Sequence, residues 1–138
     1  MECLNGAIHI TGSYNGGGDG MGGFGLNLQT TFPDAGPGCQ MIKGDGFTGI
    51  TVDVTNTKSP NNHLYVGLGL ANGNQGEYTA TLASGVQTIK LPWSLFKNKG
   101  NCGGVPGPGI QNLNFGFDWF NDGADHPVDV ILSNIGFY

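Results

Sequence analysis

The residues of this sequence that could do chemistry are polar and aromatic side chains at alternate positions of extended runs. His63 and Tyr65 alternate with aliphatic residues along one run, and Asn114 and Asp118 share one parity along another. Alternation at period two sends one set of side chains to the core and the other to an open sheet face. A sugar ring presents apolar C–H groups and a girdle of hydroxyls, which suit aromatic planes and paired polar groups. This arrangement therefore predicts a surface for carbohydrate rather than a catalytic centre.

Tyr65 is the first candidate for ligand binding on this predicted face. Gly67 and Gly69 continue its parity, and we expect them to leave the face bare as the floor of an open groove. Trp119 comes where its run ends in turn residues, so its ring is expected at a rim, with core packing as the alternative. The candidates derived from parity and position are Tyr65, His63, Trp119, Asp118, Asn114, Asp53, Asn27 and Gln29.

A hydrolytic function would need two carboxyl groups at a defined separation. The only glutamates are Glu2 at the terminus and Glu77 beside a predicted turn, so a glutamate pair is nearly excluded. Asp53 and Asp118 are a conceivable pair, but nothing in the sequence raises the basicity of either one. No serine lies in a G-x-S-x-G elbow, and no histidine pair has metal-site spacing. We therefore expect no enzymatic activity; the alternatives are a small β-sandwich glycoside hydrolase and a lectin-like adhesion module for short or terminal glycans.

These side chains are positioned by a chain that alternates predicted strands with turns. Runs of alternating hydrophobicity recur roughly every ten to twenty residues, with turn residues between them and no amphipathic helical window. The pattern predicts an all-β fold, an antiparallel β-sandwich or jelly roll. Because parity does not tell which outer surface a strand shows, Asn27 or Asp53 could instead be ordinary solvated residues. The predicted strands are 7–11, 24–32, 47–55, 63–70, 77–82, 86–91, 113–120 and 128–138, and 92–96 is a predicted short helical turn that packs Trp93 and Phe96 at the sandwich edge.

Composition limits the classes of partner. The 138 residues suffice for one domain with a core, and we treat 1–138 as a single domain. There is no arginine and the net charge is −5, whereas nucleic acid or an anionic membrane surface would need a basic surface. No apolar run reaches the length of a membrane span. Neutral polymers are therefore the natural partners.

The start of the chain and its cysteines bear on where the protein works. No leader with basic and apolar regions follows Met1, and we interpret Met1 as an added start on a protein that is exported. In a secreted domain the three cysteines predict one disulfide and one free thiol, with three pairings open. Cys3–Cys39 is the favoured pairing, which leaves Cys102 free; three reduced cysteines are the alternative.

From about residue 47 to the C-terminus, the order of the runs resembles a known family. The runs are GFTGITVDV, HLYVGLGL, VQTIKLPWSLF, IQNLNFGFDWF and VDVILSNIGFY. They look like the carbohydrate-binding modules with a galactose-binding-like jelly roll, above all the family 11 β-glucan-binding modules attached to secreted polysaccharide-degrading enzymes. The resemblance implies non-catalytic binding of a neutral plant-type polysaccharide, such as a β-glucan, xyloglucan or cellulose chains, beside a partner catalytic domain. It also adds Gln111 to the ligand candidates, because a ligand-face position of the family falls nearest to it.

Two departures from the family pattern bear on the ligand. The last strand of the family usually carries aspartate directly before an Asn–Ile pair, whereas here Ser133 precedes Asn134 and Ile135. The family often places arginine on its ligand face, and this chain has none. The resemblance therefore leaves the choice of polysaccharide open.

Structural calcium is a further expectation. Jelly rolls of this kind often hold Ca²⁺ in loops, and carboxylate oxygens suit this hard cation. Asp19 in GGGDG and Asp129 near the last predicted strand are the candidate ligands, with the loop 122–125 as a further source. The alternative is that these are ordinary turn aspartates.

If calcium is structural, its removal should destabilise the fold, because metal binding to the folded state contributes to folding free energy. Melting followed by circular dichroism, with and without a chelator, measures this, and we expect a lower melting temperature in the chelator. An unchanged melting curve would remove the idea.

Overall fold

The computed structural model describes residues 2–4, 6–15, 23–27, 46–58, 63–70, 75–99, 110–117 and 124–138. Every structural statement below refers to these residues. They form strands β1 (Glu2–Leu4), β2 (Ala7–Asn15), β3 (Gly23–Asn27), β4 (Gly49–Asn56), β5 (His63–Leu70), β6 (Gln75–Thr81), β7 (Gly85–Pro92), β8 (Lys97–Lys99), β9 (Ile110–Phe117) and β10 (Asp125–Phe137), with one 3₁₀ helix, η1 (Trp93–Leu95), between β7 and β8.

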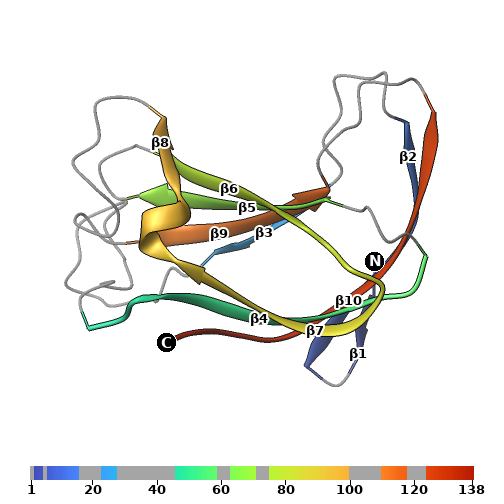
Figure 1. Cartoon of the computed structure of the whole chain (residues 1–138), viewed down its shortest axis with the longest axis horizontal. Helices are drawn as coiled ribbons and strands as arrows, with labels where there is room; N and C mark the ends of the chain where they lie inside the picture. The colour runs from blue at the N-terminus through green and yellow to red at the C-terminus, as the bar shows by residue number, and fades with distance from the viewer. Residues whose placement is uncertain are drawn as a thin grey trace.

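The strands form two sheets that face each other (Figure 1). One sheet, which we call sheet A, has the order β1-β2-β10-β4-β7, and the other, sheet B, has the order β3-β9-β5-β6-β8. Neighbouring strands pair antiparallel in both sheets. Strands that are neighbours in a sheet are mostly distant in sequence, as in β10 between β2 and β4. The predicted all-β sandwich or jelly roll is confirmed.

The space between the sheets is filled by the apolar half of each alternating strand. On β4, Ile50, Val52 and Val54 are fully buried, while the residues between them are partly exposed. Burial of one such side chain contributes about 1.5–3 kcal/mol, so reversing the parity of one strand would lose several of these contributions at once. The core is made by Ile50, Val52, Val54, Leu91, Val128, Val130 and Leu132 of sheet A, by Leu64, Val66, Leu68, Ile110, Leu113, Phe115 and Phe117 of sheet B, and by Leu82, Trp93 and Phe96.

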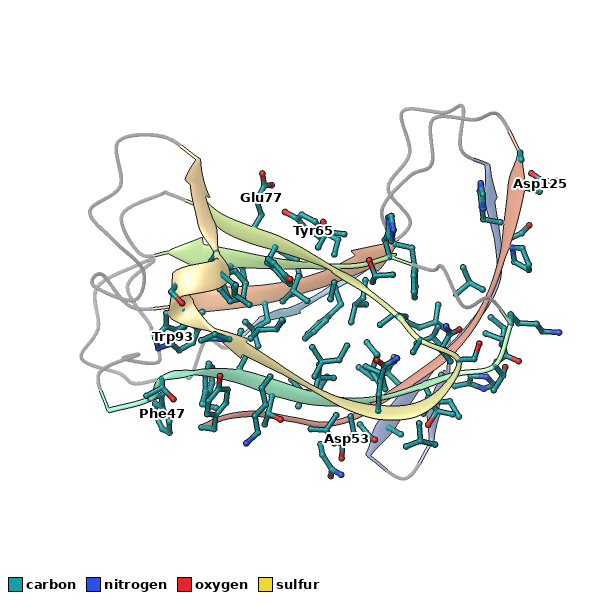
Figure 2. The ribbon with its side chains drawn as sticks, in the orientation of Figure 1. Phe47, Asp53, Tyr65, Glu77, Trp93 and Asp125 are labelled. Atoms are coloured by element: carbon teal, nitrogen blue, oxygen red, sulfur yellow. The ribbon has the colours of Figure 1, made fainter. Side chains whose placement is uncertain are left out.

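Residues around η1 close one end of the sandwich, where Figure 2 shows Trp93 between the two sheets. The Trp93 ring centroid lies 6.1 Å from that of Phe96 and 6.1 Å from that of Phe137. Its indole Nε1 donates a hydrogen bond of 2.7 Å to the carbonyl oxygen of Phe47, so the one polar atom of the ring is satisfied. The predicted helical turn and the packing role of Trp93 and Phe96 are confirmed.

The strand boundaries show where the local sequence pattern was sufficient to predict a strand and where it was not. The predicted strand 63–70 has the same bounds as β5, and β2 extends the predicted strand 7–11 to Asn15. β10 begins three residues before the predicted strand 128–138 and ends one residue before its end. The short strand β8 was not predicted, since its three residues carry no hydrophobic alternation and pair with β6 through tertiary contact. Within the described residues, no helix is long and apolar enough to cross a membrane.

Two glycines of sheet A provide a matched test of its packing. A Cβ atom added at Gly49 would lie 2.3 Å from the carbonyl oxygen of Leu91 and 2.8 Å from Cα of Pro92, which are backbone atoms held in the sheet. A Cβ added at Gly136 would meet nothing closer than Thr51 Cγ2, at 3.9 Å. We expect Gly49→Ala to lower the free energy of unfolding by about 2–3 kcal/mol.

Gly136→Ala is the control, and its effect should stay within about 1 kcal/mol, in the stabilising direction because alanine has fewer unfolded conformations to lose. Urea denaturation of both variants measures the difference. Equal free energies of unfolding would contradict the β4–β7 register that places Gly49 opposite Pro92.

Candidate functional site

The outer surface of sheet B gathers polar, aromatic and glycine residues on one face. Leu64, Val66 and Leu68 of β5 point into the core, so the intervening residues point outward. Figure 2 shows Tyr65 and Glu77 directed away from sheet A. We call this surface the Tyr65 face; it comprises His63, Tyr65, Gly67 and Gly69 of β5, Asn112, Asn114 and Gly116 of β9, and Glu77, Thr79 and Thr81 of β6.

Strand register arranges these residues in rows across the sheet. Gly67 lies between Asn114 of β9 and Glu77 of β6, and the next row places Tyr65 between Gly116 and Thr79. Directly opposite residues on neighbouring strands have Cβ atoms about 5 Å apart, so their side chains interact. Each of these rows therefore places a glycine beside larger side chains: Gly67 beside Asn114 and Glu77, and Gly116 beside Tyr65.

The Tyr65 side chain lies over Gly67, because glycine leaves room for it there. A Cβ atom at Gly67 would be 2.9 Å from both the hydroxyl oxygen and Cε1 of Tyr65. The same hydroxyl donates a long hydrogen bond of 3.4 Å to Oε2 of Glu77 on the adjacent strand. Tyr65 is only partly exposed as a result, and its hydroxyl end is placed near the middle of the face.

A second glycine of β5 accommodates an asparagine in the same way. A Cβ at Gly69 would be 2.3 Å from Oδ1 and 2.5 Å from Nδ2 of Asn112. Asn112 Oδ1 in turn accepts a hydrogen bond of 3.1 Å from Nδ2 of Asn114, which is exposed. The expectation of a bare groove floor at Gly67 and Gly69 is thus wrong, because neighbouring side chains occupy the space that the glycines leave.

Asn112 and Glu77 belong to the Tyr65 face and were missed by the sequence reasoning. Asn112 has the same parity as Asn114, so alternation would have been enough to find it. Glu77 was assigned to a turn edge, but it lies inside β6 opposite Gly67. Only the pairing of β5 with β6 shows that its carboxylate reaches Tyr65.

The remaining candidates lie at the borders of this face or outside the described residues. Asn27 ends β3 and pairs with Asn112, so its backbone is in the adjoining row. Gln111 is the extra residue of a bulge, since Gly69 pairs with Asn112 and Leu70 with Ile110. Gln29, Asp118 and Trp119 lie outside the described residues, and their assignment stays a prediction.

Asp53 belongs to the opposite surface of the molecule, which corrects its grouping with Tyr65. It sits on β4 and points outward from sheet A, in the direction opposite to Tyr65 (Figure 2). Its Oδ1 accepts a hydrogen bond of 2.6 Å from Thr88 Oγ1, and its Oδ2 accepts one of 2.8 Å from Asn134 Nδ2. These two hydrogen bonds hold the pKa of Asp53 below its ordinary value, and the one from Thr88 has the larger effect.

Asn134 reaches Asp53 because β10 bulges at this point. Ser133 pairs with Asp53 and Gly136 with Thr51, so two residues of β10 oppose one residue of β4. Asn134 has a φ of 48°, in the left-handed region that asparagine tolerates better than most residues. The Asn–Ile pair noted in the sequence therefore marks a bulge on sheet A, away from the Tyr65 face.

Asp129, a calcium candidate, is part of a hydrogen-bonded pair on sheet A. Its Oδ1 lies 2.8 Å from His9 Nε2 across the β10–β2 pairing. The hydrogen bonds of His9 and then Thr57 hold the pKa of Asp129 below its ordinary value. Among the described residues, no group of three or more His, Cys, Asp or Glu side chains could hold a metal ion. Asp19, Cys39 and Cys102 lie outside the described residues, so the Asp19 ligand and the disulfide stay predictions.

Comparison with known proteins gives likenesses in structure alone. No protein-family model matches the chain, and no curated protein sequence does so. The fold is similar to a family 11 carbohydrate-binding module of a cellulosomal cellulase of Clostridium thermocellum, with a TM-score of 0.58 and 18% identity over 97% of this chain and 83% of that one. A family 11 module from the same organism, in complex with a β-1,3-1,4-mixed-linked tetrasaccharide, has a TM-score of 0.57 and 18% identity, over 99% of this chain and 91% of that one. A solution structure of such a module has a TM-score of 0.55 and 18% identity, over 99% of this chain and 89% of that one. The chain thus shares the β-sandwich fold of these modules, as its sequence resemblance implied.

The hydrogen bonds to Asp53 predict how stability depends on pH. Because the pKa is lowered by folding, the unfolded chain binds the proton more tightly, and this stabilisation is complete above the ordinary value of 3.8 and is lost as the pH falls through the lower folded-state value. Thr88→Val removes the hydrogen bond that is the largest cause of the lowered pKa of Asp53. We therefore expect the wild type to be more stable than Thr88→Val at neutral pH, with the difference shrinking below about pH 4.

Denaturant unfolding between about pH 7 and about pH 2.5 measures the difference. Thr88→Ser keeps the hydroxyl and should follow the wild type over this range. A wild-type advantage over Thr88→Val that does not vary with pH would show that the lost stability comes from packing alone.

Proposed function

We propose that this chain is a non-catalytic module that binds a neutral plant-type polysaccharide along the Tyr65 face. The observation that carries the proposal is the set of Tyr65, Asn112, Asn114 and Glu77 on one outward sheet surface, where Tyr65 lies over Gly67, Asn112 lies over Gly69, and hydrogen bonds join Tyr65 to Glu77 and Asn114 to Asn112. A second support is the fold, which is shared with family 11 modules. The bound tetrasaccharide of one of those modules makes mixed-linkage β-glucan the first ligand to test, with xyloglucan and cellulose chains next.

The chemistry of the face suits a neutral sugar. A tyrosine ring offers an apolar plane to sugar C–H groups, and an aromatic contact of this kind contributes about 1 kcal/mol. The amides of Asn112 and Asn114 each carry donors and acceptors for sugar hydroxyls, and the Glu77 carboxylate accepts the hydrogen bond of the Tyr65 hydroxyl. A few such contacts along a polymer give a dissociation constant roughly in the micromolar to sub-millimolar range.

Among the described residues, the positions of Asp53 and Glu77 argue against catalysis by these two carboxylates. Glycoside hydrolysis needs two carboxyl groups about 5–10 Å apart on either side of one bond. Asp53 and Glu77 point outward from opposite sheets (Figure 2), and Asp53 is already engaged by Thr88 and Asn134. These two groups therefore cannot flank one glycosidic bond.

The proposed module works outside the cell, next to a catalytic domain. Tethering to a polymer raises the effective concentration of an attached enzyme at its substrate. The chain has only five basic residues and a net charge of −5, so nothing in its composition favours nucleic acid or anionic membranes as partners. This agrees with a neutral polymer as partner. Secretion and attachment to a polysaccharide-degrading enzyme belong to this proposal.

Isothermal titration against mixed-linkage β-glucan, xyloglucan, xylan, mannan and galactan tests the proposal. We expect binding to a β-glucan or xyloglucan, weakened about fivefold or more in Tyr65→Ala because one aromatic contact is lost. Trp119→Ala tests the predicted rim residue in the same way. Asp53→Asn is the matched control, since it alters the opposite sheet and should bind as the wild type does.

The length of the ligand separates the proposal from its lectin-like alternative. Affinity that rises from disaccharide to hexasaccharide indicates an extended face, whereas affinity that is constant with length indicates end recognition. Absence of binding to all five polymers and to cello-oligosaccharides by a folded protein would overturn the proposal. Release of reducing sugar on prolonged incubation would instead favour a hydrolase.

A further inference from the structure

The position of Tyr65 depends on two residues of the neighbouring row, Gly67 and Glu77. Gly67 must lack a side chain, because a Cβ there would be 2.9 Å from the Tyr65 hydroxyl oxygen and Cε1 and 3.2 Å from Cζ. Glu77, opposite Gly67 on β6, accepts the hydrogen bond of that hydroxyl at 3.4 Å. Both contacts involve the same end of the ring: Gly67 leaves the space that this end occupies, and Glu77 provides the acceptor that holds it there.

Glycine in the interior of a strand needs a reason, since it weakens the strand and often marks a close approach of other atoms. On β5 two glycines alternate with buried residues, and in each case an identified side chain lies where the Cβ would be. For Gly67 it is Tyr65 of the same strand, and for Gly69 it is Asn112 of β9. The glycines therefore serve to place outward side chains against the sheet rather than to leave the sheet open.

We propose that Gly67 and Glu77 are positioning residues that hold Tyr65 in its ligand-contacting orientation before the ligand arrives. A tyrosine on an open sheet face otherwise populates several staggered rotamers. Fixing one of them in the free protein removes an ordering cost from the binding step. This inference rests on the proposed function for the identity of the ligand, whereas the orientation of the ring is a property of the free protein.

The first experiment observes the ring without ligand, by NMR of isotope-labelled tyrosine rings. The Tyr65 signal is identified by its disappearance in Tyr65→Phe. Gly67→Ala should shift it, because the ring must move away from the new methyl group while the rest of the fold is kept. Gly69→Ala is the matched control: it displaces Asn112, whose Oδ1 lies 2.3 Å from where the new Cβ would be, and should leave the Tyr65 signal in place.

The second experiment is a double-mutant cycle on the affinity for mixed-linkage β-glucan. Glu77→Met removes the acceptor and should raise the dissociation constant roughly three- to tenfold, which is the usual effect of one hydrogen bond. Glu77→Gln retains an acceptor oxygen and should restore most of the affinity. In the Tyr65→Phe background, which lacks the hydroxyl, Glu77→Met should have no further effect.

The outcomes separate this inference from the proposed function. If Glu77→Met raises the dissociation constant by the same factor in the Tyr65→Phe background as in the wild type, Glu77 acts independently of Tyr65 and the inference is overturned. An unmoved Tyr65 signal in Gly67→Ala also overturns it. If the wild type binds none of the glycans, the proposed function fails, while the Tyr65 ring signal of Gly67→Ala, compared with that of Gly69→Ala, still decides the positioning.

Discussion

Burial of two sheets against each other is the constraint on which the rest of this structure depends. Leu64, Val66 and Leu68 of β5 are buried, and so are the alternate residues of β9 opposite them. Because side chains alternate along a strand, this burial directs Tyr65 to the outer face. The position of the candidate site thus follows from apolar side chains that lie on the other side of the sheet.

The two outer faces that this packing creates have different characters. On sheet A the acidic side chains Asp53 and Asp129 are engaged within the protein, the first by Thr88 and Asn134 and the second by His9. On sheet B, by contrast, the aromatic ring of Tyr65 and the amide of Asn112 lie against glycines of β5. The sheet A contacts lower carboxylate pKa values and join strands, whereas those of sheet B place aromatic and polar groups on an outward surface. This difference supports sheet B as the functional surface.

The glycine content of the chain acquires a specific meaning from these contacts. Glycine is a fifth of the sequence, which by itself indicates loops and turns. In β5, however, the glycines make room for Tyr65 and Asn112, and in β4 Gly49 lets the backbone of β7 approach closely. Each of these positions excludes a side chain for a different neighbour, and none of those neighbours is adjacent in sequence. The same residue type therefore serves three different contacts within one sandwich.

Alternation in the sequence was sufficient to determine the all-β class, the bounds of β5, the inward set of β4 and the outward direction of Tyr65, His63 and Asn114, because a period of two is a local property of the chain. The packing of Trp93 could also be predicted, since a tryptophan after proline at a strand end suits a sandwich edge. Only the tertiary structure decided which strands are neighbours. That pairing moved Asp53 to the opposite face, brought Glu77 to the hydroxyl of Tyr65 and placed the side chain of Asn112 over Gly69. Strand order depends on contacts between residues far apart in sequence, and parity, which is the same for both sheets, carries no information about it.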